Sequence, residues 1–135
     1  MFVGRFRLLA PSLALAVLLA SCSSGMHDVP LEECPGDEVS VTVSGGPSPM
    51  ISWAPGCGMS SLDVFPTAGG SSLWVLYSGD QAVENPFRSG IRYGHAPAGA
   101  LEVTGPVPLA VGTSYTVVVY RSPERVQAGV ATFRP

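Results

Sequence analysis

Residues 114–121, Ser-Tyr-Thr-Val-Val-Val-Tyr-Arg, are the stretch that decides the fold class. In an extended chain successive side chains point to opposite sides, so Tyr115, Val117 and Val119 share one face. β-Branched and aromatic residues are also the types that strands favour. The stretch therefore predicts a strand with one face turned toward a core.

The same alternation recurs along the chain from Val39 onward, where Val39, Val41 and Val43 alternate with serine and threonine. Gly and Pro separate the segments, and no helical stripe follows the N-terminal region. Short, regularly spaced strands predict an all-β fold, a single β-sandwich of about seven strands. The other candidate strands are Met50–Trp53, Leu62–Val64, Leu73–Tyr77, Ile91–Tyr93, Ala100–Val103 and Val130–Phe133.

Two short motifs within residues 38–135 resemble the fibronectin type III family. Residues 109–117, Leu-Ala-Val-Gly-Thr-Ser-Tyr-Thr-Val, are similar to that family's L-x-P-G-T-x-Y-T-V pattern, with Val111 in place of proline. Residues 51–55, Ile-Ser-Trp-Ala-Pro, resemble its second strand. The resemblance implies that Trp53 fills the core and that the Tyr115 hydroxyl bonds back to the preceding connection. Another immunoglobulin-like sandwich remains an alternative.

The N-terminus has the features of an export signal. Arg5 and Arg7 precede an apolar run, Leu8–Ala20, of 13 residues. At about 1.5 Å per residue the run is shorter than the roughly 30 Å hydrocarbon core of a bilayer. A cleaved signal peptide over residues 1–21 is therefore expected, with a buried N-terminal helix as the alternative.

The end of this signal, Leu19-Ala20-Ser21-Cys22, resembles the lipobox of bacterial lipoproteins. The resemblance implies that Cys22 carries a diacylglycerol and becomes the acylated N-terminus, since several chains anchor a protein far better than one. Ser23, rather than Asp, implies the outer membrane in bacteria with two membranes. The alternative is an ordinary cleavage site that leaves Cys22 free.

Residues 22–38 predict an acidic flexible tether that joins this anchor to a domain over residues 39–135. Five of the ten acids lie between Ser23 and Glu38, without an arginine. The acids lack the spacing of a calcium loop, which favours a solvated linker. Cys34 and Cys57 remain as an even pair in an exported chain, which favours a disulfide; a two-cysteine zinc site is the alternative.

The composition excludes several kinds of chemistry. All seven basic residues are arginines, so a P-loop lysine or a lysine Schiff base is impossible. The net charge of −3 argues against nucleic acid as a partner. No catalytic or metal-binding signature occurs, so we expect no catalytic residue, no metal site and no cofactor.

The stretch Ser78–Ala100 is long for a connection in a sandwich, and long loops on a rigid scaffold often bind partners. Its aromatic and arginine side chains are types favoured at interfaces. An alternative is that the two aromatic rings fill the edge of the core while the arginines are solvated. The candidate binding residues are Phe87, Arg88, Arg92, Tyr93 and His95.

These features predict a non-catalytic, membrane-anchored lipoprotein of the cell envelope that binds a protein or a polysaccharide. A small-molecule carrier would need a deep apolar pocket, for which so small a sandwich leaves little room. The other alternative is an accessory subunit or a small hydrolase. A hydrolase would need His95 within hydrogen-bond reach of a serine and of an acid such as Asp63 or Asp80.

Overall fold

The strand that the alternating sequence predicts is an inner strand of the fold. The computed structural model describes residues 32–36, 38–78, 87–121 and 125–135. In it β7 spans Tyr115–Arg121 and pairs with β3 on one side and β8 on the other. The side chains of Tyr115, Val117 and Val119 are buried, as their shared face requires. The alternation thus identifies both the strand and its inward face.

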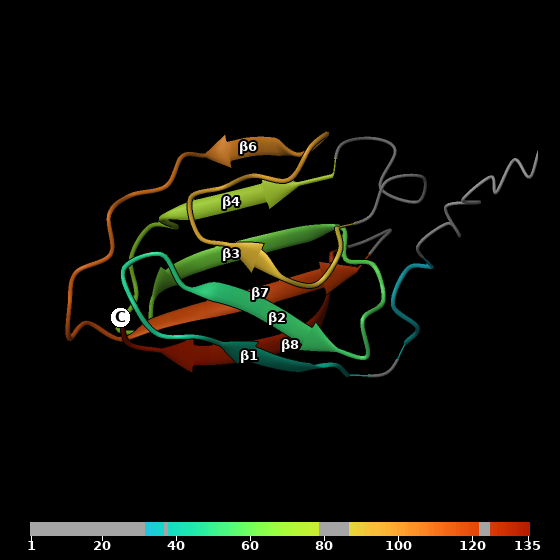
Figure 1. Cartoon of the computed structure of the whole chain (residues 1–135), viewed down its shortest axis with the longest axis horizontal. Helices are drawn as coiled ribbons and strands as arrows, with labels where there is room; N and C mark the ends of the chain where they lie inside the picture. The colour runs from blue at the N-terminus through green and yellow to red at the C-terminus, as the bar shows by residue number, and fades with distance from the viewer. Residues whose placement is uncertain (1–31, 37, 79–86, 122–124) are drawn as a thin grey trace, which may run out of the picture.

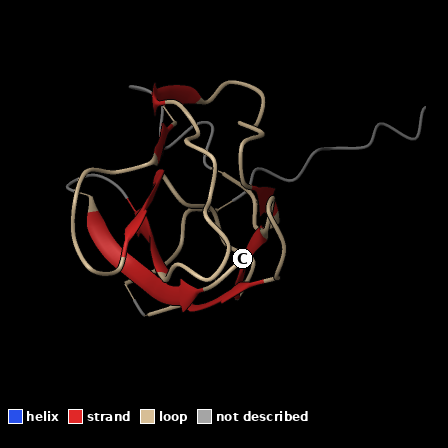
Figure 2. Ribbon diagram, turned by 90° about the vertical axis from the view of Figure 1, so that its left-hand side faces the viewer, coloured by secondary structure: helices blue, strands red, loops and turns tan. Residues whose placement is uncertain are grey.

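The described residues form two antiparallel sheets and no helix (Figures 1 and 2). The three-stranded sheet has the order β1-β2-β5, and the five-stranded sheet has the order β6-β4-β3-β7-β8. This all-β arrangement is consistent with a β-sandwich and confirms the predicted class at that level. The strands are β1 (Ser40–Val43), β2 (Met50–Ala54), β3 (Ser61–Pro66), β4 (Trp74–Tyr77), β5 (Ile91–Arg92), β6 (Leu101–Thr104), β7 (Tyr115–Arg121) and β8 (Val126–Phe133).

The core lies between the two sheets and takes side chains from both. Ile51 and Trp53 come from β2, whereas Leu62, Val64 and Trp74 come from β3 and β4. Fully burying one such aliphatic side chain stabilises the fold by about 1.5–3 kcal/mol. Apolar burial between facing sheets therefore holds the two layers together.

The sheets also meet directly along one edge, where β1 lies beside β8 (Figure 1). The backbone N–H of Val39 donates a 2.8 Å hydrogen bond to the carbonyl oxygen of Ala128. Next to this bond, Gly129 is buried against β1, and a β-carbon there would lie 2.6 Å from Cγ2 of Val41. This close approach requires a glycine at position 129.

The strand boundaries differ from expectation mainly at the C-terminus. The alternation predicted a strand over Val130–Phe133, whereas β8 begins at Val126. Gln127 and Gly129 pair with Tyr120 and Val119 of β7, and Ala128 lies at the register shift between them. This part of β8 is therefore defined by its partner strand rather than by a local alternation. Eight strands are described rather than about seven, the short β5 and β6 included.

Candidate functional site

The predicted binding stretch, Ser78–Ala100, contains β5, which is an edge strand of the three-stranded sheet. Residues 79–86 of this stretch lie outside the described residues. Beyond them β5 pairs with β2, with Ile91 opposite Ile51 and Arg92 opposite Met50. The sheet ends at β5, so the five predicted site residues lie on or beside its last strand.

The two aromatic candidates are buried and do not form an exposed patch. Phe87 is 3% exposed, and its backbone exchanges two hydrogen bonds with Met59, of 2.6 and 3.0 Å. Tyr93 is 5% exposed and contacts Trp74 edge to face, with ring centroids 5.1 Å apart. Both positions agree with the alternative interpretation, in which the two rings fill the edge of the core.

The hydroxyl of Tyr93 points inward and donates a 2.7 Å hydrogen bond to the carbonyl oxygen of Val107. Burial, together with the nearby phenol of Tyr115, raises the pKa of Tyr93 to about 12. The phenol is therefore neutral over the physiological range. Tyr93 thus ties β5 to the connection between β6 and β7 and acts as a structural residue.

The three remaining candidates, Arg88, Arg92 and His95, are exposed and line one surface cleft of about 400 Å³. The residues on either side of them, from β5 and the turn after it, complete the cleft. No Asp or Glu is among the described residues that line it. These are Phe87, Arg88, Ser89, Gly90, Ile91, Arg92, His95, Pro97 and Ala98.

The position of Arg92 is fixed by a contact with the neighbouring loop. Its Nη1 donates a 3.1 Å hydrogen bond to the carbonyl oxygen of Ser48, and the hydroxyl of Ser48 donates a 2.7 Å bond to the carbonyl oxygen of Tyr93. One guanidinium nitrogen is therefore committed to the protein. The guanidinium has further N–H donors, and Arg92 is among the residues that line the cleft.

The backbone beneath the arginines is also well anchored. The hydroxyl of Ser89 accepts a 2.8 Å hydrogen bond from the N–H of Trp53 and donates a 3.0 Å bond to its carbonyl oxygen. Gly90, at a φ of 95°, donates its N–H to the carbonyl oxygen of Ile51 at 3.1 Å. Ser89 and Gly90 therefore hold the segment between Arg88 and Arg92 against β2.

The arrangement can bind an anion, because its polar groups are cationic or donors. Among the residues that the structure describes, the side chains of Arg88 and His95 have no hydrogen-bond or salt-bridge partner. His95 is thus not bonded to a serine or a carboxylate within that part of the chain. Asp63 lies on β3, in the other sheet from β5, and Asp80 lies outside the described residues.

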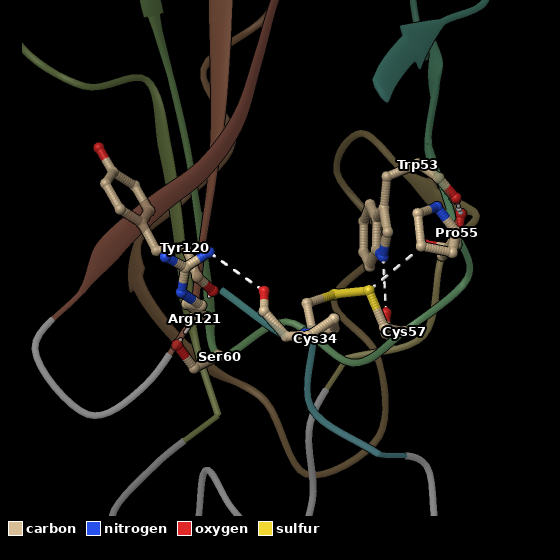
Figure 3. Close-up of a disulfide and its surroundings, with 9 residues drawn as sticks. Cys34, Trp53, Pro55, Cys57, Ser60, Tyr120 and Arg121 are labelled. Atoms are coloured by element: carbon tan, nitrogen blue, oxygen red, sulfur yellow. Dashed lines mark hydrogen bonds between the residues drawn. A yellow bond between two sulfur atoms is a disulfide. The ribbon is translucent and has the colours of Figure 1, made fainter. Parts of the chain in front are cut away.

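The predicted disulfide is present: Cys34 is bonded to Cys57, with their Cα atoms 4.6 Å apart (Figure 3). The indole N–H of Trp53 donates a 2.7 Å hydrogen bond to the carbonyl oxygen of Cys57, and Nη1 of Arg121 donates a 3.2 Å bond to that of Pro35. These contacts tie residues 34 and 35 to both sheets. The expected disulfide between Cys34 and Cys57 is confirmed.

The predicted lipid attachment site, Cys22, and the signal peptide over residues 1–21 lie outside the described residues. So does most of the proposed tether. Within the ranges that the structure describes, no helix is long and apolar enough to span a membrane.

Sequence reasoning missed several residues that build the site. Ser48 and Ser89 position the arginine-bearing segment, but a serine next to Gly or Pro in a loop is too common to stand out. Trp74 was expected only as part of a strand. Its indole N–H donates a 2.9 Å hydrogen bond to the carboxylate of Glu102, which joins β4 to the edge strand β6.

Comparison of the chain with family models, with curated proteins and with solved structures found no match.

Proposed function

We propose that this protein is a lipid-anchored lipoprotein of the bacterial cell envelope whose single fibronectin type III-like domain binds a protein or polysaccharide partner. In this proposal the domain acts without catalysis, and the cleft beside β5 is its binding site. Three separate observations support the anchor, the family and the site.

The anchor rests on the sequence. The run Leu19-Ala20-Ser21-Cys22, behind an apolar segment and two arginines, resembles a lipobox. A Cys22 that carries two or three acyl chains would hold the domain stably at a membrane, since each buried CH₂ contributes about 0.8 kcal/mol. Ser23 after the cysteine favours the outer membrane where a bacterium has two.

The strand order supports a fibronectin type III-like or immunoglobulin-like identity. If the strands take the letters A, B, C, C′, E, F and G, then β1, β2 and β5 are A, B and E. Strands β4, β3, β7 and β8 are then C′, C, F and G, in the order that this sheet has in immunoglobulin-like sandwiches. The edge strand β6 is additional, since it follows E and pairs beyond C′.

Two side-chain features, one hydrogen bond and one buried ring, support the same fibronectin type III-like or immunoglobulin-like identity. The hydroxyl of Tyr115 accepts a 2.8 Å hydrogen bond from the N–H of Ala110, as a tyrosine corner does at the start of strand F. Trp53 lies on the second strand and is 4% exposed, as the family resemblance implies for a core tryptophan.

The observation that carries the binding function is the cleft itself. It gathers Arg88, Arg92 and His95 on a rigid support, and among the residues described these side chains contribute little to the fold. Exposed arginines in a concave surface are typical of binding sites rather than of packing.

Crosslinking and pull-down from intact envelopes test the binding function. We expect the full-length chain to recover a reproducible partner that is lost with Arg88→Ala/Arg92→Ala. The matched control is Arg134→Ala, which removes an exposed arginine outside the cleft. Undiminished recovery with the double variant would reject the site.

Membrane sedimentation tests the anchor separately. We expect the wild-type chain in the membrane fraction and Cys22→Ala in the soluble fraction, with incorporation of labelled palmitate only in the wild type. A Cys22→Ala variant that still sediments with membranes would contradict the lipid anchor without affecting the binding site.

A further inference from the structure

The cleft beside β5 shows which chemistry its ligand must have. Arg88 and Arg92 come from β5 and the segment before it, and His95 comes from the turn after it. The backbone N–H of His95 donates a 3.0 Å hydrogen bond to the carbonyl oxygen of Arg92, which fixes the turn. Two guanidinium groups and an imidazole therefore line one cleft, and none of the described lining residues is acidic.

The two arginines are suited to planar anions. Arg92 is held in place through Ser48, so little side-chain entropy is lost when its remaining N–H groups bind a ligand. Arg88 has no partner among the described residues and can form a second contact. Guanidinium groups bind carboxylates, sulfates and phosphates with paired, charge-assisted hydrogen bonds.

The apolar residues of the lining argue against a protein surface as the main ligand. Phe87 and Ile91 are buried, at 3% and 4% exposure, so their side chains are not available as anchors. The exposed part of the lining consists of arginine, histidine and small residues. Protein interfaces instead depend on large apolar or aromatic side chains that fill pockets on the partner.

The size of the cleft favours a short segment of a polymer. Its volume of about 400 Å³ is near the lower end of the range for ligand clefts. Such a volume suits about one or two sugar rings that carry a charged group. The attraction between its anionic substituents and the two arginines would hold a ligand of this kind.

We therefore propose that the cleft beside β5 binds an acidic polysaccharide, through the carboxylate, sulfate or phosphate groups on its sugars. Arg88 and Arg92 pair with one anionic group or with two consecutive groups. His95 forms a polar contact from the adjoining wall. This inference rests on the proposed binding function and specifies its ligand class.

Affinity measurements on the full-length chain in detergent test the ligand class. The probes are polygalacturonate for carboxylate groups, dextran sulfate for sulfate groups, and neutral dextran and polyglutamate as comparisons. We expect binding to at least one charged glycan, none to neutral dextran, and weaker binding as NaCl rises from about 50 to about 300 mM.

Arg88→Gln/Arg92→Gln should weaken glycan binding by about tenfold or more, because hydrogen bonds to charged groups are lost. The control Arg134→Gln removes one arginine charge outside the cleft and should bind like the wild type. Circular dichroism establishes that both variants fold. Equal losses in both would mean that binding is nonspecific and would overturn the proposal.

The remaining outcomes separate this inference from the proposed function. Binding to polyglutamate as tight as to the glycans would replace the polysaccharide with an acidic protein segment. If no glycan binds while the pull-down still depends on Arg88 and Arg92, the ligand class is wrong and the binding function stands. If neither glycan binding nor recovery of the partner depends on Arg88 and Arg92, both the ligand class and the proposed binding site are wrong.

Discussion

The hydroxyl of Tyr115 accepts a 2.8 Å hydrogen bond from the backbone N–H of Ala110, which ties the first residue of β7 to the connection before it. Tyr115 is 4% exposed, and its ring lies 5.7 Å from that of Phe133 on β8. The phenol thus joins a loop to the core at the end of the sandwich where β7 begins.

Tyr115→Phe keeps the ring and removes the hydrogen bond. We expect the free energy of unfolding to fall by about 1 kcal/mol, the usual net contribution of one such bond. Urea unfolding followed by tryptophan fluorescence measures it. Tyr77→Phe is the matched control, because the Tyr77 hydroxyl has no hydrogen-bond partner among the described residues. A loss of equal size in both variants would refute a special role for Tyr115.

Gly129 lies on β8 where this strand packs closely against Val39 and Val41. A β-carbon there would lie 2.8 Å from the carbonyl oxygen of Val39 and 2.6 Å from Cγ2 of Val41. The valine side chain can adjust, but the carbonyl belongs to backbone held by the bond from Val39 to Ala128. We expect Gly129→Ala to destabilise the fold by about 1–3 kcal/mol.

Thermal unfolding of Gly129→Ala beside Gly45→Ala measures this effect. A β-carbon on Gly45 meets no atom within 4 Å, so this second variant should unfold close to the wild-type temperature. A wild-type midpoint for Gly129→Ala would show that β1 and β8 can separate without cost.

The bond between Cys34 and Cys57 closes a loop with a sequence separation of 23 residues. In the chain-entropy model a loop of this length stabilises the folded state by about 3 kcal/mol. Cys34→Ala/Cys57→Ala, and reduction of the wild type, should both lower the denaturation midpoint. Two free thiols in protein purified from the envelope would contradict the bond, and an unchanged midpoint after reduction would contradict its contribution.

Because of Tyr93, we expect the free energy of unfolding to fall in alkaline solution. Burial raises its folded-state pKa to about 12, above its ordinary value of 10.0. The unfolded chain therefore releases this proton at lower pH than the folded one. The stabilising difference is fully present below about pH 10 and is lost as the pH rises to about 12. Burial also raises the pKa of Tyr120, which acts in the same direction.

Urea unfolding between pH 9 and pH 12 checks this prediction. We expect the free energy of unfolding of the wild type to decline across this window, and that of Tyr93→Phe to decline less steeply. Tyr93→Phe should also be less stable at neutral pH, because it loses the bond to the carbonyl of Val107. Parallel declines in the two proteins would show that Tyr93 does not titrate as stated.

The strands were largely predictable because alternation is a local property. Val39 to Val43 and Tyr115 to Val119 each show which face is buried without reference to any other segment. The start of β8 was not predictable in this way. Residues 126–129 belong to β8 because Val126, Gln127 and Gly129 pair with β7, and the pattern of these few residues does not reveal that partner strand.

The candidate site was only partly predictable. The sequence places Phe87, Arg92 and Tyr93 in one long connection, but it does not show which of them face the core. Tyr93 is buried because Trp74 and Val107 from other segments enclose it, while Arg92 is held at the surface by Ser48. These contacts join residues far apart in the chain.

By itself, then, the sequence determined the all-β class and the inward faces of its main strands, and it favoured a disulfide between Cys34 and Cys57. These follow from the period of side chains in a strand and from residue type, which act within a few positions. The tertiary structure alone decided that Gly129 must lack a side chain, that Phe87 and Tyr93 are core residues and that Arg88, Arg92 and His95 share a cleft. Each of these depends on how closely separate segments pack, a property that arises only once the two sheets are in contact.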